Sequence, residues 1–206
     1  MIRTRSRHRP ELLQQRAGVL SLTIGVVLLS VTRNLLARRW PGHLTTIQLL
    51  SYGLLLLTSL TAAWYAGLAP RDLGLSWGRL TLRLGGALVL TAVLTAPSLL
   101  HGVSASAAAT ALPGALAVAT IEELLFRGVL YTLWHSIAGT GGAAVLTSVA
   151  FAMSHAFLYP PPLLLLGLIA GLLLASWRAL ANDLVAPIVA HAVVDAIAGG
   201  ALAGIP

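Results

Sequence analysis

The sequence contains no cysteine and no lysine, and it has few acidic residues. Without cysteine the chain can form no disulfide, no thiolate metal site and no cysteine nucleophile. Its 13 basic residues are all arginine, against 6 Asp and Glu, and charged residues make up only 9% of the chain. With 57% hydrophobic residues and a mean hydropathy of +0.88, this composition predicts a polytopic membrane protein rather than a soluble domain.

The net charge of +7 does not indicate nucleic-acid binding, because the arginines cluster in the N-terminal tail and the early loops. There they fit the positive-inside rule and the anionic inner face of a membrane. We therefore expect the lipid bilayer as a partner and no nucleic acid. Arginine without lysine, together with abundant Ala, Gly and Leu, is typical of a GC-rich bacterial genome and favours a bacterial inner membrane.

Apolar segments define the expected fold. Residues 1–16 form a basic tail, and residues 17–206 form one membrane domain with seven apolar segments, at 17–37, 46–68, 81–100, 113–134, 141–159, 162–178 and 185–204. Several are close to the roughly 20 residues that cross a bilayer. We expect an all-α helical bundle with about seven transmembrane helices.

The ends of these segments predict the orientation. Nine arginines lie at ends that are cytoplasmic if the N-terminus is inside, whereas Arg33, Arg38 and Arg39 lie at an outer end. The positive-inside rule then predicts a cytoplasmic N-terminal tail and a C-terminus on the outer side.

Three smaller features carry expectations for local structure. Pro70 to Trp77 has the composition of a short interfacial segment, with Trp77 at headgroup depth. Pro113 suits the first turn of the fourth helix, where a missing N–H is tolerated. Asn182 or Asp183 can cap the seventh helix.

The fourth segment places Glu122, Glu123 and Arg127 within an otherwise apolar run. Each charge costs about 3 kcal/mol at the centre of an inserting helix, so this helix should lie inside the bundle with the three side chains pointing inward. Glu123 and Arg127 are spaced i, i+4 and can form an ion pair that leaves Glu122 free as a general base. A purely architectural cluster is the alternative, although a single Glu–Arg pair would serve that purpose.

Two other segments carry imidazoles. His155 lies in the fifth segment, and His191 and Asp195 share one face of the seventh at i, i+4 spacing. A lone histidine is often a hydrogen-bonded core residue, and Asp195 could simply orient His191. Three segments nevertheless place acids or imidazoles at mid-membrane while the other four carry no central ionisable residue. This distribution indicates a functional site.

Peptide hydrolysis within the membrane matches these residue types. It requires a base for water, a stabiliser for the oxyanion and an acid for the leaving amine. The sequence contains no His-Glu-x-x-His zinc motif, no Gly-x-Ser-Gly of rhomboid type and no Gly-x-Gly-Asp of presenilin type.

Three ordered motifs resemble those of the CPBP intramembrane protease family, also called Abi, which includes the type II CAAX prenyl endopeptidases. The motifs are Glu122-Glu123-x-x-x-Arg127, Phe151-x-x-x-His155 and His191-x-x-x-Asp195. The segment Asp72-Leu-Gly-Leu75 also resembles a loop often seen there. The resemblance covers roughly residues 70 to 200.

The resemblance implies an intramembrane endopeptidase that acts on a membrane-associated protein or peptide. Glu122 and His155 would activate a water, and His191 and Asp195 would hold the oxyanion. The family is commonly labelled metalloprotease, yet a metal-free glutamate mechanism is also argued for it, so the resemblance leaves both zinc and no cofactor open. Asp195 stands where the eukaryotic pattern has Asn, and an ionised Asp cannot donate a hydrogen bond to an oxyanion.

Two other functions use the same residue types. A proton-coupled transporter or relay also needs mid-membrane carboxylates and histidines, but the segment count is small and we find no internal repeat. A non-catalytic membrane scaffold would keep the fold, yet every catalytic position of the resemblance is occupied.

Overall fold

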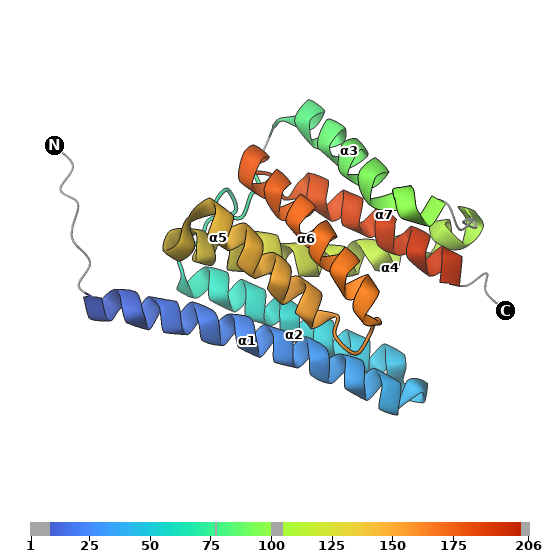
Figure 1. The fold of residues 1–206 in the computed structure, drawn as a ribbon, viewed down its shortest axis with the longest axis horizontal. Helices are drawn as coiled ribbons and strands as arrows, with labels where there is room; N and C mark the ends of the chain where they lie inside the picture. Colours follow the sequence, from blue (N-terminus) through green and yellow to red (C-terminus); the bar gives the residue numbers. More distant parts are fainter. Residues whose placement is uncertain (1–8, 77, 100–104, 203–206) are drawn as a thin grey trace.

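The computed structural model describes residues 9–76, 78–99 and 105–202, and this part of the chain is a helical bundle (Figure 1). A short 3₁₀ helix η1 (Pro41–His43) joins the first two helices, and a π-helix η2 (Leu124–Leu130) joins the fourth to the fifth. The α-helices are α1 (Arg9–Arg39), α2 (Leu44–Tyr65), α3 (Leu80–Leu99), α4 (Ala105–Glu123), α5 (Tyr131–Ser154), α6 (Pro161–Ala181) and α7 (Val185–Leu202). The predicted all-α class is confirmed.

The expectation of seven separate helices needs one correction. In the described residues, four helical runs are long and apolar enough to cross a membrane, and Leu80–Ala96 and Val185–Ala198 form two shorter apolar helices, six in all. The segment predicted at 113–134 and most of the one predicted at 141–159 lie in one continuous run, Ala107–Ser154. Two helices meet in this run at Gly139, whose φ of 70° and ψ of −177° suit a residue without a Cβ.

The helix boundaries differ from the sequence-based expectations at three points. α1 begins at Arg9, so the second half of the predicted tail is helical, and residues 1–8 lie outside the described residues. α4 begins at Ala105, which places Pro113 inside the helix rather than in its first turn. The predicted interfacial Trp77 also lies outside the described residues.

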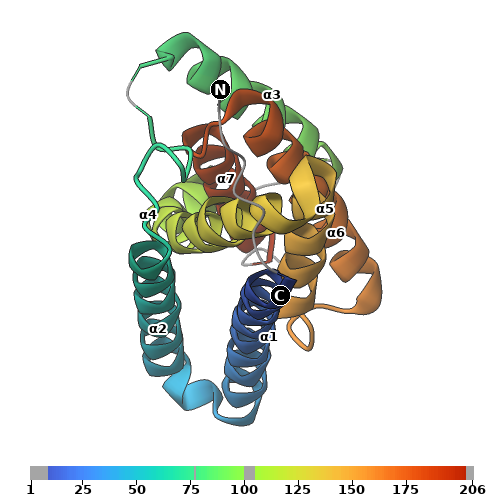
Figure 2. The same ribbon diagram turned by 90° about the vertical axis from the view of Figure 1, so that its left-hand side faces the viewer.

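The α4–η2 run lies at the centre of the bundle. α4 packs against α7, α3 packs against the same α7, and α5 packs against α6 and α1. α1 and α2 form a pair linked by η1 (Figure 2). The apolar core around η2 consists of Leu125, Phe126, Leu130, Val26, Leu55, Ala150 and Phe151.

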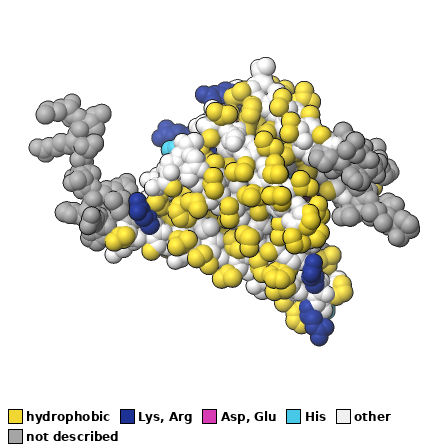
Figure 3. All heavy atoms as spheres, in the orientation of Figure 1, with side chains coloured by type: hydrophobic (Ala, Val, Ile, Leu, Met, Phe, Trp, Pro, Cys, Tyr) yellow, Lys and Arg dark blue, Asp and Glu magenta, His cyan; other side chains and the backbone are white. Residues whose placement is uncertain are grey.

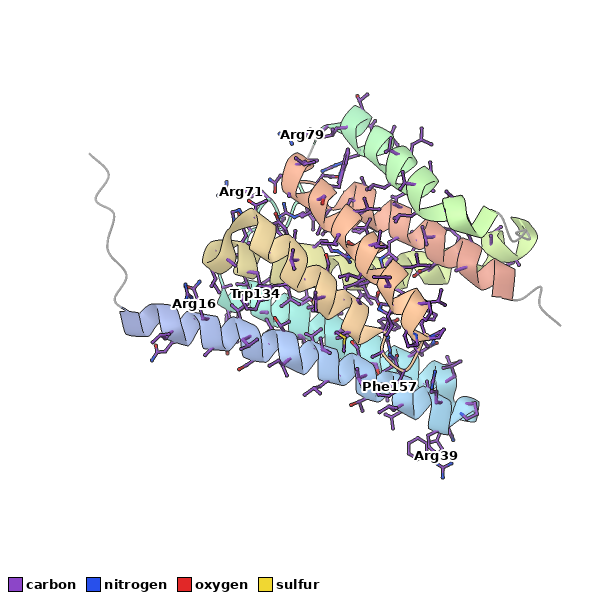
Figure 4. All side chains as sticks on the ribbon, viewed as in Figure 1. Arg16, Arg39, Arg71, Arg79, Trp134 and Phe157 are labelled. Atoms are coloured by element: carbon purple, nitrogen blue, oxygen red, sulfur yellow. The ribbon has the colours of Figure 1, made fainter. Side chains whose placement is uncertain are left out.

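Hydrophobic side chains cover most of the face shown in Figure 3, and arginines appear toward its ends. Arg16, Arg71 and Arg79 lie on one side of the bundle and Arg39 at the opposite end (Figure 4). An apolar exterior of this kind fits a lipid environment, since large exposed apolar surfaces are rare on soluble monomers. The chain is a multi-pass membrane protein.

The connection between α6 and α7 uses both residues that the sequence offered as caps. Asn182 ends α6 in the left-handed conformation, at φ 48° and ψ 46°. Asp183 caps α7, because its Oδ2 accepts a hydrogen bond from the backbone N–H of Ala186 at 3.0 Å. Asp183 also accepts one from Arg83 Nε at 2.9 Å, which ties α3 to the start of α7.

Candidate active site

The structure brings together all six side chains that the sequence predicted for the site, from four elements. Glu122 and Glu123 end α4, Arg127 lies in η2, His155 directly follows α5, and His191 and Asp195 lie on α7. Glu122 is 3% exposed, and Glu123 and Arg127 are fully buried. The inward orientation expected from the cost of these charges in lipid is therefore observed.

Glu123 and Arg127 form the expected ion pair, with Arg127 Nη1 2.6 Å from Glu123 Oε1. The guanidinium carbon also lies 4.3 Å from the centre of the Phe151 ring. The pair spans the start of the π-helix, a local widening of a helix that is often found at functional sites. Glu123 and Arg127 thus neutralise each other inside the protein.

His191 lies between two carboxylates. Its Nδ1 is 2.8 Å from Glu123 Oε1, and its Nε2 is 3.4 Å from Asp195 Oδ2. The Asp195 side chain is 38% exposed, so it lies at the mouth of the site rather than in its buried part. Asp195 therefore contacts His191 from the open side while Glu123 holds the opposite nitrogen.

Both imidazoles direct Nε2 toward one oxygen of Glu122. His155 Nε2 and His191 Nε2 are each 3.9 Å from Glu122 Oε2. These distances are too long for direct hydrogen bonds and match groups that share one water molecule.

The tautomer of His155 follows from its surroundings. Its Nδ1 lies 2.9 Å from the carbonyl oxygen of Phe151. A carbonyl oxygen can only accept a hydrogen bond, so Nδ1 carries the proton and Nε2 presents a lone pair toward Glu122. The Tyr159 ring stacks on the imidazole, with centroids 5.8 Å apart, and helps to hold this orientation.

The sequence analysis missed two residues of the site, Arg33 and Tyr52. Arg33 Nη1 is 3.8 Å from Glu122 Oε1, and the Tyr52 hydroxyl donates to the same oxygen at 3.2 Å. Glu122 therefore has a cation near it, contrary to the expectation that it is left free, and Arg33, expected at an outer segment end, is buried beside it. The signal was present, because Arg33-Asn34 is a polar pair inside the apolar segment 17–37.

The side chains do not form a ready metal site. Zinc in proteins is held by three or four His, Cys, Asp or Glu donors at about 2.0–2.3 Å. Across the described residues, no group of three or more such side chains is arranged to hold a metal ion.

A cavity of about 410 Å³ lies elsewhere, at the Arg71 end of the bundle. In its wall, Arg178 Nε donates to the backbone carbonyl of Arg127 at 3.0 Å, and Arg178 Nη2 donates to that of Asp72 at 2.7 Å. Arg178 thus anchors η2 to the 70–75 loop that the sequence singled out. The cavity contains none of the six predicted site residues.

Comparison with known proteins identifies the region that carries the site. Neither a curated protein nor a solved structure matches the chain. A family model described as Rce1-like, type II CAAX prenyl endopeptidase Rce1-like, matches residues 104–197. This range includes the six predicted site residues and excludes α1 and α2, which supply Arg33 and Tyr52. Residues 104–197 are therefore similar to the Rce1-like family of type II CAAX prenyl endopeptidases.

Proposed function

We propose that this protein is an intramembrane endopeptidase that hydrolyses peptide bonds of membrane-associated proteins or peptides. The observation that carries the proposal is the convergence of His155 Nε2 and His191 Nε2 on Glu122 Oε2, each at 3.9 Å, in a buried site. The family match supports the same reaction class. We also propose the bacterial inner membrane as the location, with the N-terminus in the cytoplasm.

Glu122 and His155 are suited to activate a water molecule. An ionised Glu122 Oε2 and the lone pair of His155 Nε2 are two hydrogen-bond acceptors 3.9 Å apart. A water has two O–H donors and can bridge such a pair, which leaves an oxygen lone pair for attack on a carbonyl carbon. The two side chains therefore orient and activate the same nucleophile.

The reaction then balances without a further reactant. As the water oxygen bonds to the carbonyl carbon, Glu122 takes its proton and the carbonyl oxygen becomes an oxyanion. When the C–N bond breaks, the proton passes from Glu122 or through His155 to the leaving nitrogen. The products are a carboxylic acid and an amine.

The neighbouring pairs keep this geometry rigid. Glu123 is fixed by Arg127 at 2.6 Å and in turn fixes His191 at 2.8 Å. Because His191 is held through Nδ1, its Nε2 stays directed toward Glu122. A preorganised site of this kind avoids reorganisation during the reaction.

The test is hydrolysis of a membrane-tethered fluorogenic peptide by the full chain in lipid vesicles. Glu122→Gln and His155→Ala should each lower turnover by about 10²-fold or more while the protein still accumulates and keeps its thermal stability. His135→Ala is a matched control, because His135 is an exposed histidine of α5 outside the site.

Near-complete hydrolysis by Glu122→Gln would show that the assigned base is wrong. If the wild-type chain instead hydrolyses no peptide and moves protons across the vesicle membrane in a Glu122-dependent manner, the protein is a proton transporter.

A further inference from the structure

Arg33 places a buried guanidinium in the site, although it lies outside residues 104–197, which match the family model. The residue is 4% exposed, and its Nε donates to Asn34 Oδ1 at 3.1 Å. Its Nη1 is buried and has no hydrogen-bond partner among the described residues, although it lies 3.8 Å from Glu122 Oε1. A buried donor without an acceptor is unfavourable, and here it lies beside the carboxylate that we propose as the base.

The position of Arg33 is fixed relative to His155. Asn34 Nδ2 donates to the backbone carbonyls of Ser154 and Ala156, at 2.9 and 3.0 Å. These carbonyls flank His155 on either side. The polar pair of α1 therefore aligns the guanidinium with the turn that carries the water-activating imidazole.

Arg33 and Glu122 do not form a closed ion pair. The nearest N–O distance is 3.8 Å, whereas Arg127 and Glu123 in the same site approach to 2.6 Å. Tyr52 donates its hydroxyl hydrogen to the same Glu122 oxygen that Arg33 approaches. Arg33 is thus held near Glu122 without using the hydrogen-bonding capacity of Nη1.

The proposed reaction needs a donor for the oxyanion. His191 faces carboxylates with both ring nitrogens, and an ionised Asp195 cannot donate. Arg127 is fully buried and is held by Glu123 through Nη1 and by the Gly171 carbonyl through Nη2, so that of its donors Nε alone lacks a partner among the described residues. We propose that Arg33 is a further catalytic residue, whose Nη1 donates a hydrogen bond to the oxyanion of the tetrahedral intermediate. This inference rests on the proposed function.

Charge transfer during the reaction fits this role. When Glu122 takes the water proton, its carboxyl becomes neutral and the substrate oxygen gains the negative charge. The guanidinium then exchanges a loose interaction with Glu122 for a direct one with the oxyanion, and the net charge of the site does not change. An interaction that strengthens only in the transition state accelerates the chemical step.

The experiment compares Arg33→Gln, Arg33→Lys and Arg38→Gln in the vesicle assay. Arg33→Gln should lower kcat by about 10²–10³-fold with KM changed less than about threefold. Arg33→Lys should recover part of this loss, because an ammonium keeps the charge but not the planar fork. Arg38→Gln removes an exposed arginine from the same helix and should leave kcat unchanged.

A second readout separates this role from a structural one. A peptide phosphinate resembles the tetrahedral intermediate, and its affinity should fall in Arg33→Gln by a factor similar to the fall in kcat/KM. The affinity for an uncleavable N-methylated peptide, which resembles bound substrate, should remain within about threefold. Equal losses for both ligands would overturn the proposal.

The remaining outcomes are also decisive. If Glu122→Gln is inactive while Arg33→Gln retains wild-type kcat, the role of Arg33 fails and the proposed function stands. If the wild type hydrolyses no peptide, the proposed function itself fails. Should Arg33→Gln not accumulate, Arg33→Lys decides through its kcat and phosphinate affinity, and failure of both variants to fold would make Arg33 structural.

Discussion

Glu122 and Glu123 are adjacent in the sequence but differ in their surroundings. Successive helical residues point about 100° apart, so the two side chains face different neighbours. Glu123 points to Arg127 and His191, at 2.6 and 2.8 Å, and is locked between them. Glu122 points to the two imidazole Nε2 atoms and, within the described part of the chain, has one direct hydrogen bond, from Tyr52. The helix thereby separates a structural carboxylate from the one we propose as base.

Asp195 discriminates between a metal-dependent and a metal-free site. We expect Asp195→Asn to retain activity, because the amide keeps the shape and can still contact His191 Nε2, now 3.4 Å from Asp195 Oδ2. Asp195→Ala should lower kcat by about 10²-fold, since the imidazole loses its partner on the open side. The measurement is hydrolysis before and after chelation, with metal analysis of the purified protein.

The metal-free expectation has a clear contrary outcome. Carboxylates beside a ligating imidazole raise its basicity, so a metal site would be weakened by the loss of charge in Asp195→Asn. Stoichiometric zinc in the purified protein, with an inactive Asp195→Asn variant restored by excess metal, would assign His155 and His191 as ligands.

At the scale of elements, α7 is held in register by contacts at its beginning. Asp183 caps its first turn, and the same carboxylate accepts a hydrogen bond from Trp177 Nε1 at 3.4 Å. Trp177 lies against Gly86 of α3, where an added Cβ would come within 2.1 to 2.6 Å of the indole ring. Small residues allow such close helix packing in membranes. Gly86 therefore helps to position the helix that carries His191.

Gly86→Ala tests this connection. The clash with Trp177 should destabilise the protein by about 1–3 kcal/mol and lower peptide hydrolysis, because α7 shifts. Gly85→Ala is a matched control, since a Cβ at Gly85 meets nothing within 4 Å and alanine has the higher helix propensity. The measurements are thermal unfolding in detergent and hydrolysis in vesicles. Equal stability of the two variants would show that α3 and α6 adjust without consequence for α7.

At the scale of the whole molecule, the arginines distinguish its two ends. Arg16, Arg71 and Arg79 lie toward one end and Arg39 at the other (Figure 4). Because Arg33 is buried in the site, it no longer counts among the arginines of the outer face. The excess of arginines on the N-terminal side over the outer side is therefore larger than the sequence alone indicated. The site lies nearer the opposite end, beside the turn after α5 that includes Phe157.

Reporter fusions test the orientation that follows. Fusions after Trp40 and Tyr159 should report the outer side, and fusions after Leu75, Gly139 and Asn182 should report the cytoplasm. The fusion at Gly139 is the most informative, because it tests whether the run from Ala107 to Ser154 turns back at the kink. An outer location for Leu75 would reverse the orientation. An outer location of Gly139 alone would remove two crossings, the one before the kink and the one after it.

The sequence by itself determined the membrane class and the six residues of the predicted site. Charges in apolar segments are costly in lipid, so Glu122, Glu123 and Arg127 had to face inward, and i, i+4 spacing was sufficient to pair Glu123 with Arg127. Both inferences depend on local spacing and on the energetics of one helix.

The tertiary structure decided the contacts between residues that are far apart in the sequence. Tyr52 and Glu122 are 70 residues apart, and only the packing of α2 beside α4 places the phenol on the carboxylate. Arg33 was counted with the charges at an outer segment end, because its position along the chain can be read from the sequence. Which neighbouring helix its side chain faces could not be read in the same way. The approach of His155 Nε2 and His191 Nε2 to the same Glu122 oxygen likewise depends on how α4, α5 and α7 pack, because packing sets the distances between side chains of different helices.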